Sequence, residues 1–361
     1  MDEQLKIIYK DLAEVTNKIS DVSKDLSGKT LLITGPNGLL ASYIVDTIAY
    51  LNDKKLLDKP CKVIGLSRSK IEKSSRLGHL LNRKDIKFIT HDVIDPYNLE
   101  SEKQIDYIIH AAGRSAPATF QSDPLGTIDV NVKGIRWLLD YTKDNPIKSF
   151  LYMSSGETYG NPTPENIPTP ETYPGNVSPL APRACYTESK RLSETLCNVY
   201  FQQYQIPVKI ARPFIVYGPG LPITDRRVMA DFMRFGIEGT PIEMLSEGLD
   251  KRSYCYISDA TVAFFRMLLS DHNGEAFNIA NDAEEISIRD LAENIHEICG
   301  IKEPVTVKKS PDAKFISDAP KRVLPDISKA KKLLKYDPEI GISEGLKRTV
   351  NWNKAFFNKY V

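Results

Sequence analysis

The chain has 361 residues, of which 41% are hydrophobic and 26% are charged, with a formal net charge of +1. That length accommodates one large α/β domain or two smaller ones. The balanced charge argues against a nucleic-acid-binding protein, which usually carries a basic stripe. The five cysteines are scattered, so the sequence indicates neither a disulfide framework nor a metal site. With no signal-peptide features and no membrane-length apolar run, we expect a cytoplasmic protein without a membrane partner.

The hydrophobic pattern predicts alternating helices and strands. Apolar spacing of three and four over residues 3–25 predicts a helix, expected to pack on the domain surface rather than to bind a partner. Short apolar runs predict strands at Thr30–Thr34, Lys62–Leu66, Lys87–Thr90, Tyr107–His110, Ser149–Met153 and Pro207–Pro213. Helical spacing runs to about Leu51 after the first strand and returns at Asn131–Tyr141 and Cys185–Tyr200. This alternation predicts an α/β fold with a Rossmann-like, doubly wound parallel sheet.

The turn after the first predicted strand, Gly35-Pro36-Asn37-Gly38, indicates a phosphate-binding site. Glycines allow the backbone to approach a pyrophosphate, and the helix N-terminus that follows offers free N–H groups and the positive end of its dipole. The spacing Gly35, Gly38, Ala41 differs from the usual G-x-G-x-x-G pattern of dinucleotide folds. An ordinary strand-to-helix connection is therefore the alternative for this turn taken alone.

Other residues follow the predicted strands at the edge where such sheets bind ligands. Asp92 and Ala111–Gly113 occupy two of these strand ends. The second strand ends in Leu66-Ser67-Arg68 without the acid that favours NAD, so Arg68 is a candidate contact for a 2′-phosphate or a plain surface residue. The choice between NAD and NADP stays open at this point.

Tyr186 and Lys190 are four residues apart and therefore share one face of a predicted helix. A nearby ammonium lowers the pKa of a tyrosine, so we expect Tyr186 to take a proton from a sugar hydroxyl while hydride leaves the same carbon. Ser155, at the end of the fifth predicted strand, is placed to orient that hydroxyl.

These motifs occur in an order that resembles the extended short-chain dehydrogenase/reductases that modify nucleotide sugars. The matching segments are Thr34–Ala41, Asp92, His110–Ala112, Asn131, Ser154-Ser155, Tyr159-Gly160, Tyr186–Lys190, Ala211–Pro213, Tyr217–Gly220, Arg252–Ala260 and Phe277–Ala280. The resemblance extends from about residue 27 to the C-terminus. It implies a tightly held nicotinamide that is reduced and reoxidised in one turnover, through a 4-keto sugar. It also implies a homodimer formed by the helices near Asn131–Tyr141 and Cys185–Tyr200.

The resemblance assigns roles to individual residues. Catalysis is assigned to Ser155, Glu157, Tyr186 and Lys190. Contacts with NAD are assigned to Gly35, Asn37, Gly38, Leu39, Leu40, Arg68, Asp92, Val93, Ala111, Ala112, Gly113, Asn131, Tyr186, Lys190 and Pro213. Contacts with the nucleotide-sugar substrate are assigned to Arg114, Ser115, Arg227, Arg252 and Arg322.

Gly156-Glu157 bears on which reaction follows oxidation of the sugar. A 4,6-dehydratase has Asp-Glu here, and Gly156 cannot protonate a leaving hydroxyl. Simple epimerases usually have no acid at the position of Glu157, whereas UDP-glucuronate decarboxylases keep a Glu there, preceded by Ser or Thr. The alternative for Glu157 is a loop acid bonded to backbone N–H groups.

Three hypotheses remain. The first is a UDP-glucuronate decarboxylase-like enzyme in which Arg322 holds the carboxylate and Arg252 a diphosphate; a surface ion pair is the alternative for Arg252. The second is a 4-epimerase or an unusual 4,6-dehydratase, and the third is a non-catalytic nucleotide-binding protein. We expect residues 1–26 to form a helical extension, 27–213 an NAD-binding domain and 214–361 a smaller, mainly substrate-binding lobe, some of whose segments return to the first domain.

Overall fold

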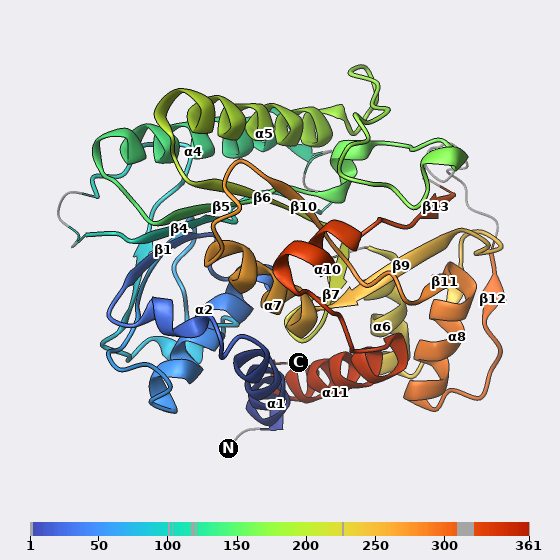
Figure 1. Cartoon of the computed structure of the whole chain (residues 1–361). Helices are drawn as coiled ribbons and strands as arrows, with labels where there is room; N and C mark the ends of the chain where they lie inside the picture. The colour runs from blue at the N-terminus through green and yellow to red at the C-terminus, as the bar shows by residue number, and fades with distance from the viewer. Residues whose placement is uncertain are drawn as a thin grey trace.

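The computed structural model describes residues 3–99, 102, 104–116, 120, 122–225, 227–308 and 321–360. A seven-stranded sheet with the order β10-β6-β5-β4-β1-β2-β3 forms the centre of the molecule (Figure 1). Its strands are β1 (Thr30–Thr34), β2 (Lys62–Ser67), β3 (Ile86–Thr90), β4 (Tyr107–His110), β5 (Ser149–Met153), β6 (Val208–Pro213) and β10 (Ala276–Ile279). Every neighbouring pair is parallel, so the predicted Rossmann-like sheet is confirmed.

Helices cover both faces of this sheet. On one face, α4 (Pro124–Asp144) packs along α5 (Ala184–Tyr204), above β5 and β6 in Figure 1. On the other face lie α2 (Leu39–Asp53) and α7 (Ile257–Leu268). Each face has its own apolar cluster, one built on α4 and α5 and a larger one on α2 and α7. Burial on both faces explains why the central strands are continuous apolar runs.

The second half of the chain adds two smaller sheets. The larger comprises β7 (Ile215–Tyr217), β9 (Lys251–Tyr256), β11 (Glu285–Ser287) and β13 (Arg322–Val323), and the smaller β8 (Glu243–Met244) and β12 (Thr306–Val307). The accompanying helices are α6 (Val228–Glu238), α8 (Ile288–Cys299), α10 (Ser328–Leu334) and α11 (Ile342–Tyr360). Because β10 returns to pair with β6, the chain crosses between the sheets. The division at residue 213 stays a prediction.

The first helix, α1 (Glu3–Lys18), packs against α2, α7 and α11. Its apolar face is fully covered by these helices, through Ile8, Leu12 and Val15. On the same helix the buried Asp11 carboxylate accepts hydrogen bonds from Tyr43, Tyr256 and Arg348, which belong to α2, β9 and α11. Burial raises the pKa of Asp11 to about 6. The helix therefore packs on the domain through one buried face and leaves its other face exposed, as expected.

No helix in the described ranges is long and apolar enough to cross a membrane.

Replacing Leu12 by alanine tests whether α1 stabilises the whole domain. Leu12 is 2% exposed, and removing such a buried side chain usually costs about 2–5 kcal/mol. We expect a loss of that size in the free energy of unfolding, measured by urea denaturation. Asn17→Ala, on the exposed side of the same helix, is the control and should change it little. Equal effects of the two substitutions would contradict the packing.

Candidate active site

The predicted phosphate-binding turn lies where β1 and β4 end side by side. The Thr34 hydroxyl oxygen accepts hydrogen bonds from the backbone N–H groups of Ala111 and Ala112, at 3.2 and 3.1 Å. Gly35 has a φ of +65°, and a Cβ there would lie 2.9 Å from Ala112 Cα. Only glycine fits this approach. The next residues turn directly into α2, whose N-cap is Gly38, so the first N–H groups of the helix face the same strand edge.

The other predicted cofactor positions lie at this carboxyl edge of the sheet. Asp92 and Val93 follow β3, Ala111–Gly113 follow β4, and Pro213 ends β6. Arg68 follows β2 and is exposed, and its charge joins that of Arg114 in lowering the pKa of Asp123. Asn37, in the turn itself, accepts a hydrogen bond from the Leu77 backbone N–H at 3.3 Å.

Asn131, on α4, carries a buried polar atom without a protein partner. Its Nδ2 donates to Ser189 Oγ at 2.8 Å, while its Oδ1 is shielded from solvent and accepts no hydrogen bond from the described residues. A Cβ built on Gly113 would lie 3.4 Å from that oxygen and 3.5 Å from Lys190 Nζ. An unused acceptor beside an ammonium and a glycine fits a polar ligand such as the ribose of a dinucleotide. The site therefore fits NAD.

Tyr186 and Lys190 lie on the buried face of α5, each 5% exposed. Lys190 Nζ donates to the Met153 carbonyl at 2.8 Å and lies 6.0 Å from the centre of the Tyr186 ring. Burial lowers the pKa of Lys190 to about 8. Ser155, two residues after β5, lies close enough to the Tyr186 phenol for its hydroxyl to lower the pKa of that group. The structure thus brings together the three residues that the sequence assigned to proton transfer.

The expectation that the Tyr186 pKa is lowered is wrong in this structure. Burial of the phenol, followed by the charge of Glu157, raises its pKa to about 12. Three groups oppose this rise: the hydroxyl of Ser155 and the guanidinium groups of Arg227 and Arg183. Spacing along a helix predicts that two side chains are neighbours, but it does not predict how completely they are desolvated.

Glu157 lies beside this group, in the short 3-10 helix η3 (Gly156–Tyr159). Its carboxylate pairs with Arg183, Oε1 to Nη2 at 3.2 Å, and both side chains are partly exposed. The acid is therefore bonded to a side chain, and Ser155, not Glu157, caps η3. Arg183 belongs to none of the motifs in the sequence, although its position three residues before Tyr186 places both near the start of one helix.

The predicted substrate residues are distributed around the site. Arg227 pairs with Asp225 at the start of α6, close enough to Tyr186 to affect its pKa. Arg252 lies on β9 and is 9% exposed, so it is not a surface residue. Its side chain donates to the Lys251 carbonyl at 2.8 Å and lies 3.7 Å from the Asp250 carboxylate.

The remaining two arginines and Ser115 differ in their surroundings. Arg114 pairs with Asp123, the N-cap of α4, and the adjacent Ser115 is exposed. Arg322 on β13 is held by both oxygens of Glu285, at 2.7 and 3.0 Å. Arg322 also lines a small hollow of about 20 Å³ together with Gly156, Tyr159, Phe214 and Leu324. The structure therefore places Arg322 and Gly156, 166 positions apart in sequence, on the same small hollow, and leaves Arg114 at the α4 end of the site.

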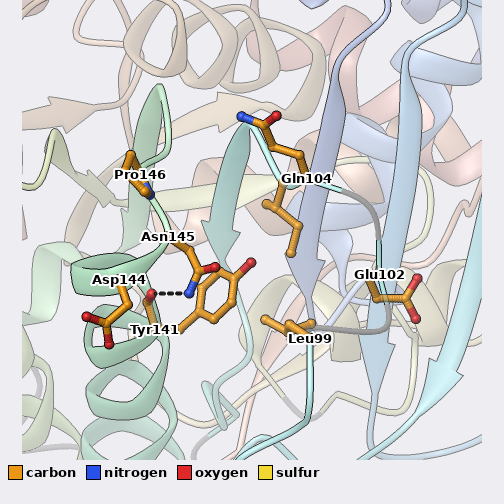
Figure 2. A pocket seen from close by; sticks show the side chains of 8 residues that line it. Leu99, Glu102, Gln104, Tyr141, Asp144, Asn145 and Pro146 are labelled. Carbon is orange, nitrogen blue, oxygen red and sulfur yellow. Dashed lines mark hydrogen bonds between the residues drawn. The ribbon is translucent and has the colours of Figure 1, made fainter.

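A larger hollow of about 390 Å³ lies outside this site, at the C-terminal end of α4 and before the start of β4 (Figure 2). Leu99, Tyr141 and Asn145 are among its lining residues, and Asn145 Nδ2 donates to the Tyr141 carbonyl at 3.0 Å. Parallel sheets of this kind bind ligands at the carboxyl ends of their strands, so this position does not suit the active site. Within the described part of the chain, no group of three or more His, Cys, Asp or Glu side chains is placed to hold a metal ion.

The ring of Phe214 occupies the space beside Gly156. A Cβ on Gly156 would lie 2.7–2.8 Å from three ring carbons of Phe214, and that ring is stacked 5.9 Å from the Tyr159 ring. We expect Gly156→Ser to lower the free energy of unfolding by about 1–3 kcal/mol, the usual effect of overpacking. The measurement is thermal or urea unfolding. Phe214→Leu in the same chain should recover part of the loss, and additive effects of the two substitutions would contradict the contact.

Comparisons with known proteins agree with the fold. A model of the NAD dependent epimerase/dehydratase family matches residues 31–280. UDP-glucuronic acid decarboxylase 1 of Arabidopsis thaliana is 34% identical over 89% of this chain and 69% of that protein. UDP-glucuronic acid decarboxylase 1 of Xenopus tropicalis is 30% identical over 90% of this chain and 72% of that protein.

Among solved structures, an epimerase of Methanothermobacter thermautotrophicus superposes with a TM-score of 0.80 and 26% identity, covering 95% of this chain and 97% of that one. The UDP-glucuronic acid 4-epimerase of Bacillus cereus, solved with UDP-glucuronic acid and NAD, superposes with a TM-score of 0.74 at 24% identity, covering 92% of this chain and all of that one, and so supports the fold. The family match covers more than half of the sequence, and the chain belongs to the NAD dependent epimerase/dehydratase family.

Proposed function

We propose that the protein is an NAD-dependent enzyme that decarboxylates UDP-glucuronate through a 4-keto intermediate. The observation that carries the proposal is the joint placement of Ser155, Glu157 and Tyr186 beside the buried Lys190, with Arg322 next to Gly156. The relatives named as UDP-glucuronic acid decarboxylases support the choice of substrate.

The roles of the proton-transferring residues follow from their contacts. Tyr186 takes the proton of the sugar 4-hydroxyl, and Ser155, which lies beside the phenol, orients that hydroxyl. Lys190 supplies positive charge on the buried side of the phenol and is anchored by the Met153 carbonyl. NAD, when bound, accepts a hydride from the sugar and later returns it. The turn after β1 and the Asn131 carboxamide are the groups that would hold it.

Decarboxylation needs a carboxylate attached to the carbon next to the oxidised one, and a group that transfers a proton. A β-keto acid loses carbon dioxide readily because the resulting negative charge spreads onto the ketone oxygen. Arg322 would hold the uronate carboxylate, since a guanidinium binds carboxylates through paired hydrogen bonds. Glu157 would orient the sugar ring, or it would transfer the proton that is delivered to the carbon from which carbon dioxide leaves.

The remaining predicted contacts concern the rest of the substrate. Arg252 and Arg227 would bind the diphosphate and the nucleotide, and Arg114 with Ser115 would line the sugar pocket. Each of the three arginines has an acidic neighbour in the structure. When an anionic substrate binds, each arginine would therefore exchange its carboxylate partner for a negatively charged group of the substrate.

A 4-epimerase is the alternative within the same site, and the match to a solved epimerase at a TM-score of 0.80 favours it as the second candidate. An atypical 4,6-dehydratase is disfavoured because Gly156 offers no proton donor and Phe214 fills the adjoining space. A non-catalytic nucleotide-binding protein would not require a serine hydroxyl and a buried lysine beside a buried tyrosine.

Mass spectrometry of the purified enzyme with UDP-glucuronate and NAD tests the reaction. We expect a product lighter by one molecule of carbon dioxide. An isomeric product of unchanged mass would establish epimerisation instead. Tyr186→Phe should reduce turnover about 100- to 10,000-fold, the usual contribution of general acid–base catalysis. NAD binding by this variant, followed by fluorescence, is the control. Full activity in the variant would exclude the proposed role of Tyr186.

We further propose a homodimer in a reducing, cytoplasmic compartment. The five cysteines are all unpaired, which fits such a compartment. The outer sides of α4 and α5 expose several large apolar residues: Leu125, Ile128, Leu192 and Val199. A second copy that packs its own α4 and α5 against them would cover this surface.

Light scattering tests the dimer. We expect twice the mass of one chain at micromolar concentration, and Leu192→Glu should produce a folded monomer because the partner would have to bury the new charge. Leu249→Glu, an equally apolar-to-acidic change at an exposed position outside α4 and α5, is the matched control and should remain dimeric. A wild-type monomer would contradict the proposal.

A further inference from the structure

Arg183 contacts both the acid and the tyrosine of the active site, and no motif of the sequence analysis included it. We propose that Arg183 is a positioning residue. It fixes Glu157 beside Tyr186 and balances the negative charge of Glu157 during proton transfer. The proposal rests on the proposed role of Tyr186 in oxidising the sugar, but it does not depend on which reaction follows the oxidation.

The backbone of Arg183 is tied to the tyrosine. Arg183 is the N-cap of α5, and its carbonyl accepts a hydrogen bond from the Tyr186 N–H at 3.1 Å. A shift of Tyr186 therefore moves Arg183 with it. The two residues form one rigid end of the helix.

The side chain of Arg183 reaches the tyrosine through a stack of planar groups. Its guanidinium carbon lies 5.6 Å from the centre of the Phe120 ring. The Phe120 ring in turn stacks on the Tyr186 ring, with centres 5.4 Å apart and planes 18° from parallel. Phe120 is 1% exposed, so the stack has little freedom to move. A guanidinium held over an aromatic ring keeps its orientation, which is a property that lysine does not share.

The same guanidinium bonds to Glu157, Nη2 to Oε1 at 3.2 Å. Because the stack fixes the guanidinium, this bond also fixes the carboxylate. Arg183 Nε is shielded from solvent and has no acceptor among the described residues. A buried donor left without an acceptor is unfavourable. An arginine that served stability alone would not be expected to keep such an unpaired donor next to an active site.

The ion pair of Arg183 with Glu157 affects the ionisation of Tyr186 through the charges around its phenol. The groups that face its phenol are Ser155 and Glu157 after β5, Arg183 and Lys190 on α5, and Arg227 at the start of α6. Glu157 disfavours the phenolate, whereas Arg183 and Arg227 favour it. The ion pair of Arg183 with Glu157 therefore offsets part of the rise in the Tyr186 pKa that the nearby acid causes.

The experiment measures ionisation of Tyr186 in the NAD-loaded enzyme. Tyrosine is labelled with a stable carbon isotope at its phenolic carbon, and the Tyr186 signal is the one that Tyr186→Phe lacks. The chemical shift is followed across the alkaline range in which circular dichroism shows the protein to be folded. We expect Arg183→Gln to reduce the ionised fraction at a fixed pH about 3- to 10-fold, a shift of roughly half to one pH unit.

Companion variants separate positioning from folding. Glu157→Gln should increase the ionised fraction, and Arg183→Gln combined with Glu157→Gln should return it toward the wild-type value. Arg183→Lys should retain part of the wild-type ionised fraction of Tyr186, because lysine keeps the charge but not the planar stack. Arg234→Gln is the matched control: Arg234 is equally exposed, forms ion pairs and lies over the Phe235 ring, but is not among the charges that act on Tyr186.

Unchanged ionisation of Tyr186 in both Arg183→Gln and Glu157→Gln would overturn the proposal. An equal change in the ionisation of Tyr186 in the control Arg234→Gln would also overturn it. The rising limb of the pH profile for turnover of UDP-glucuronate should move to higher pH in Arg183→Gln, in the same direction as the ionisation. The ionisation measurement needs no turnover. A shift in ionisation without carbon dioxide release would therefore refute the proposed reaction and leave the role of Arg183 standing.

Discussion

The close approach of two strand ends, at Gly35 and Ala112, is the constraint on which the rest of the site depends. The Thr34 hydroxyl joins the ends of β1 and β4 by hydrogen bonds, and Gly35 leaves no side chain between them. The chain after β4 must then turn away at Gly113, directly above Asn131 and Lys190. One backbone contact thus sets both the predicted phosphate-binding turn and the floor of the proposed cofactor site.

The site divides into a dry interior and a charged rim. Tyr186 and Lys190 are buried, and their pKa values move in opposite directions, upward for the phenol and downward for the ammonium, because burial disfavours both charged forms. Acid–arginine pairs form the rim, including Glu157 with Arg183 and Glu285 with Arg322. Charge is therefore available where an anionic substrate would enter, and the proposed proton transfer would take place where water is excluded.

Much of the fold follows from local sequence. The predicted bounds of β1, β4 and β5 agree with the structure because each is a continuous apolar run between polar turn residues. The pairing of β10 with β6 was not predicted, since a strand far along the chain carries no local sign of its neighbour. The contacts of Phe214 with Gly156, and of Glu285 with Arg322, likewise depend on tertiary packing.

In the candidate site, too, local sequence predicts some residues but not the contacts made by tertiary packing. Spacing on one helix was enough to pair Tyr186 with Lys190, but it did not reveal the burial that raises the tyrosine pKa. Arg183 has no motif of its own and becomes recognisable through its tertiary contacts with Glu157 and with Phe120, 63 positions earlier in the sequence. Local pattern thus identifies chemically reactive residues, whereas the residues that hold them in place are found from the folded structure.

The packing of α1 against α11 has a practical consequence. Arg348 on α11 bonds to both Asp11 and Glu14 on α1, so the first and last helices are joined at one end of the molecule. In Figure 1 this end lies opposite α4 and α5. An affinity tag or a fused fluorescent protein at either terminus would extend from the far side, leaving the outer surface of α4 and α5 free for a partner.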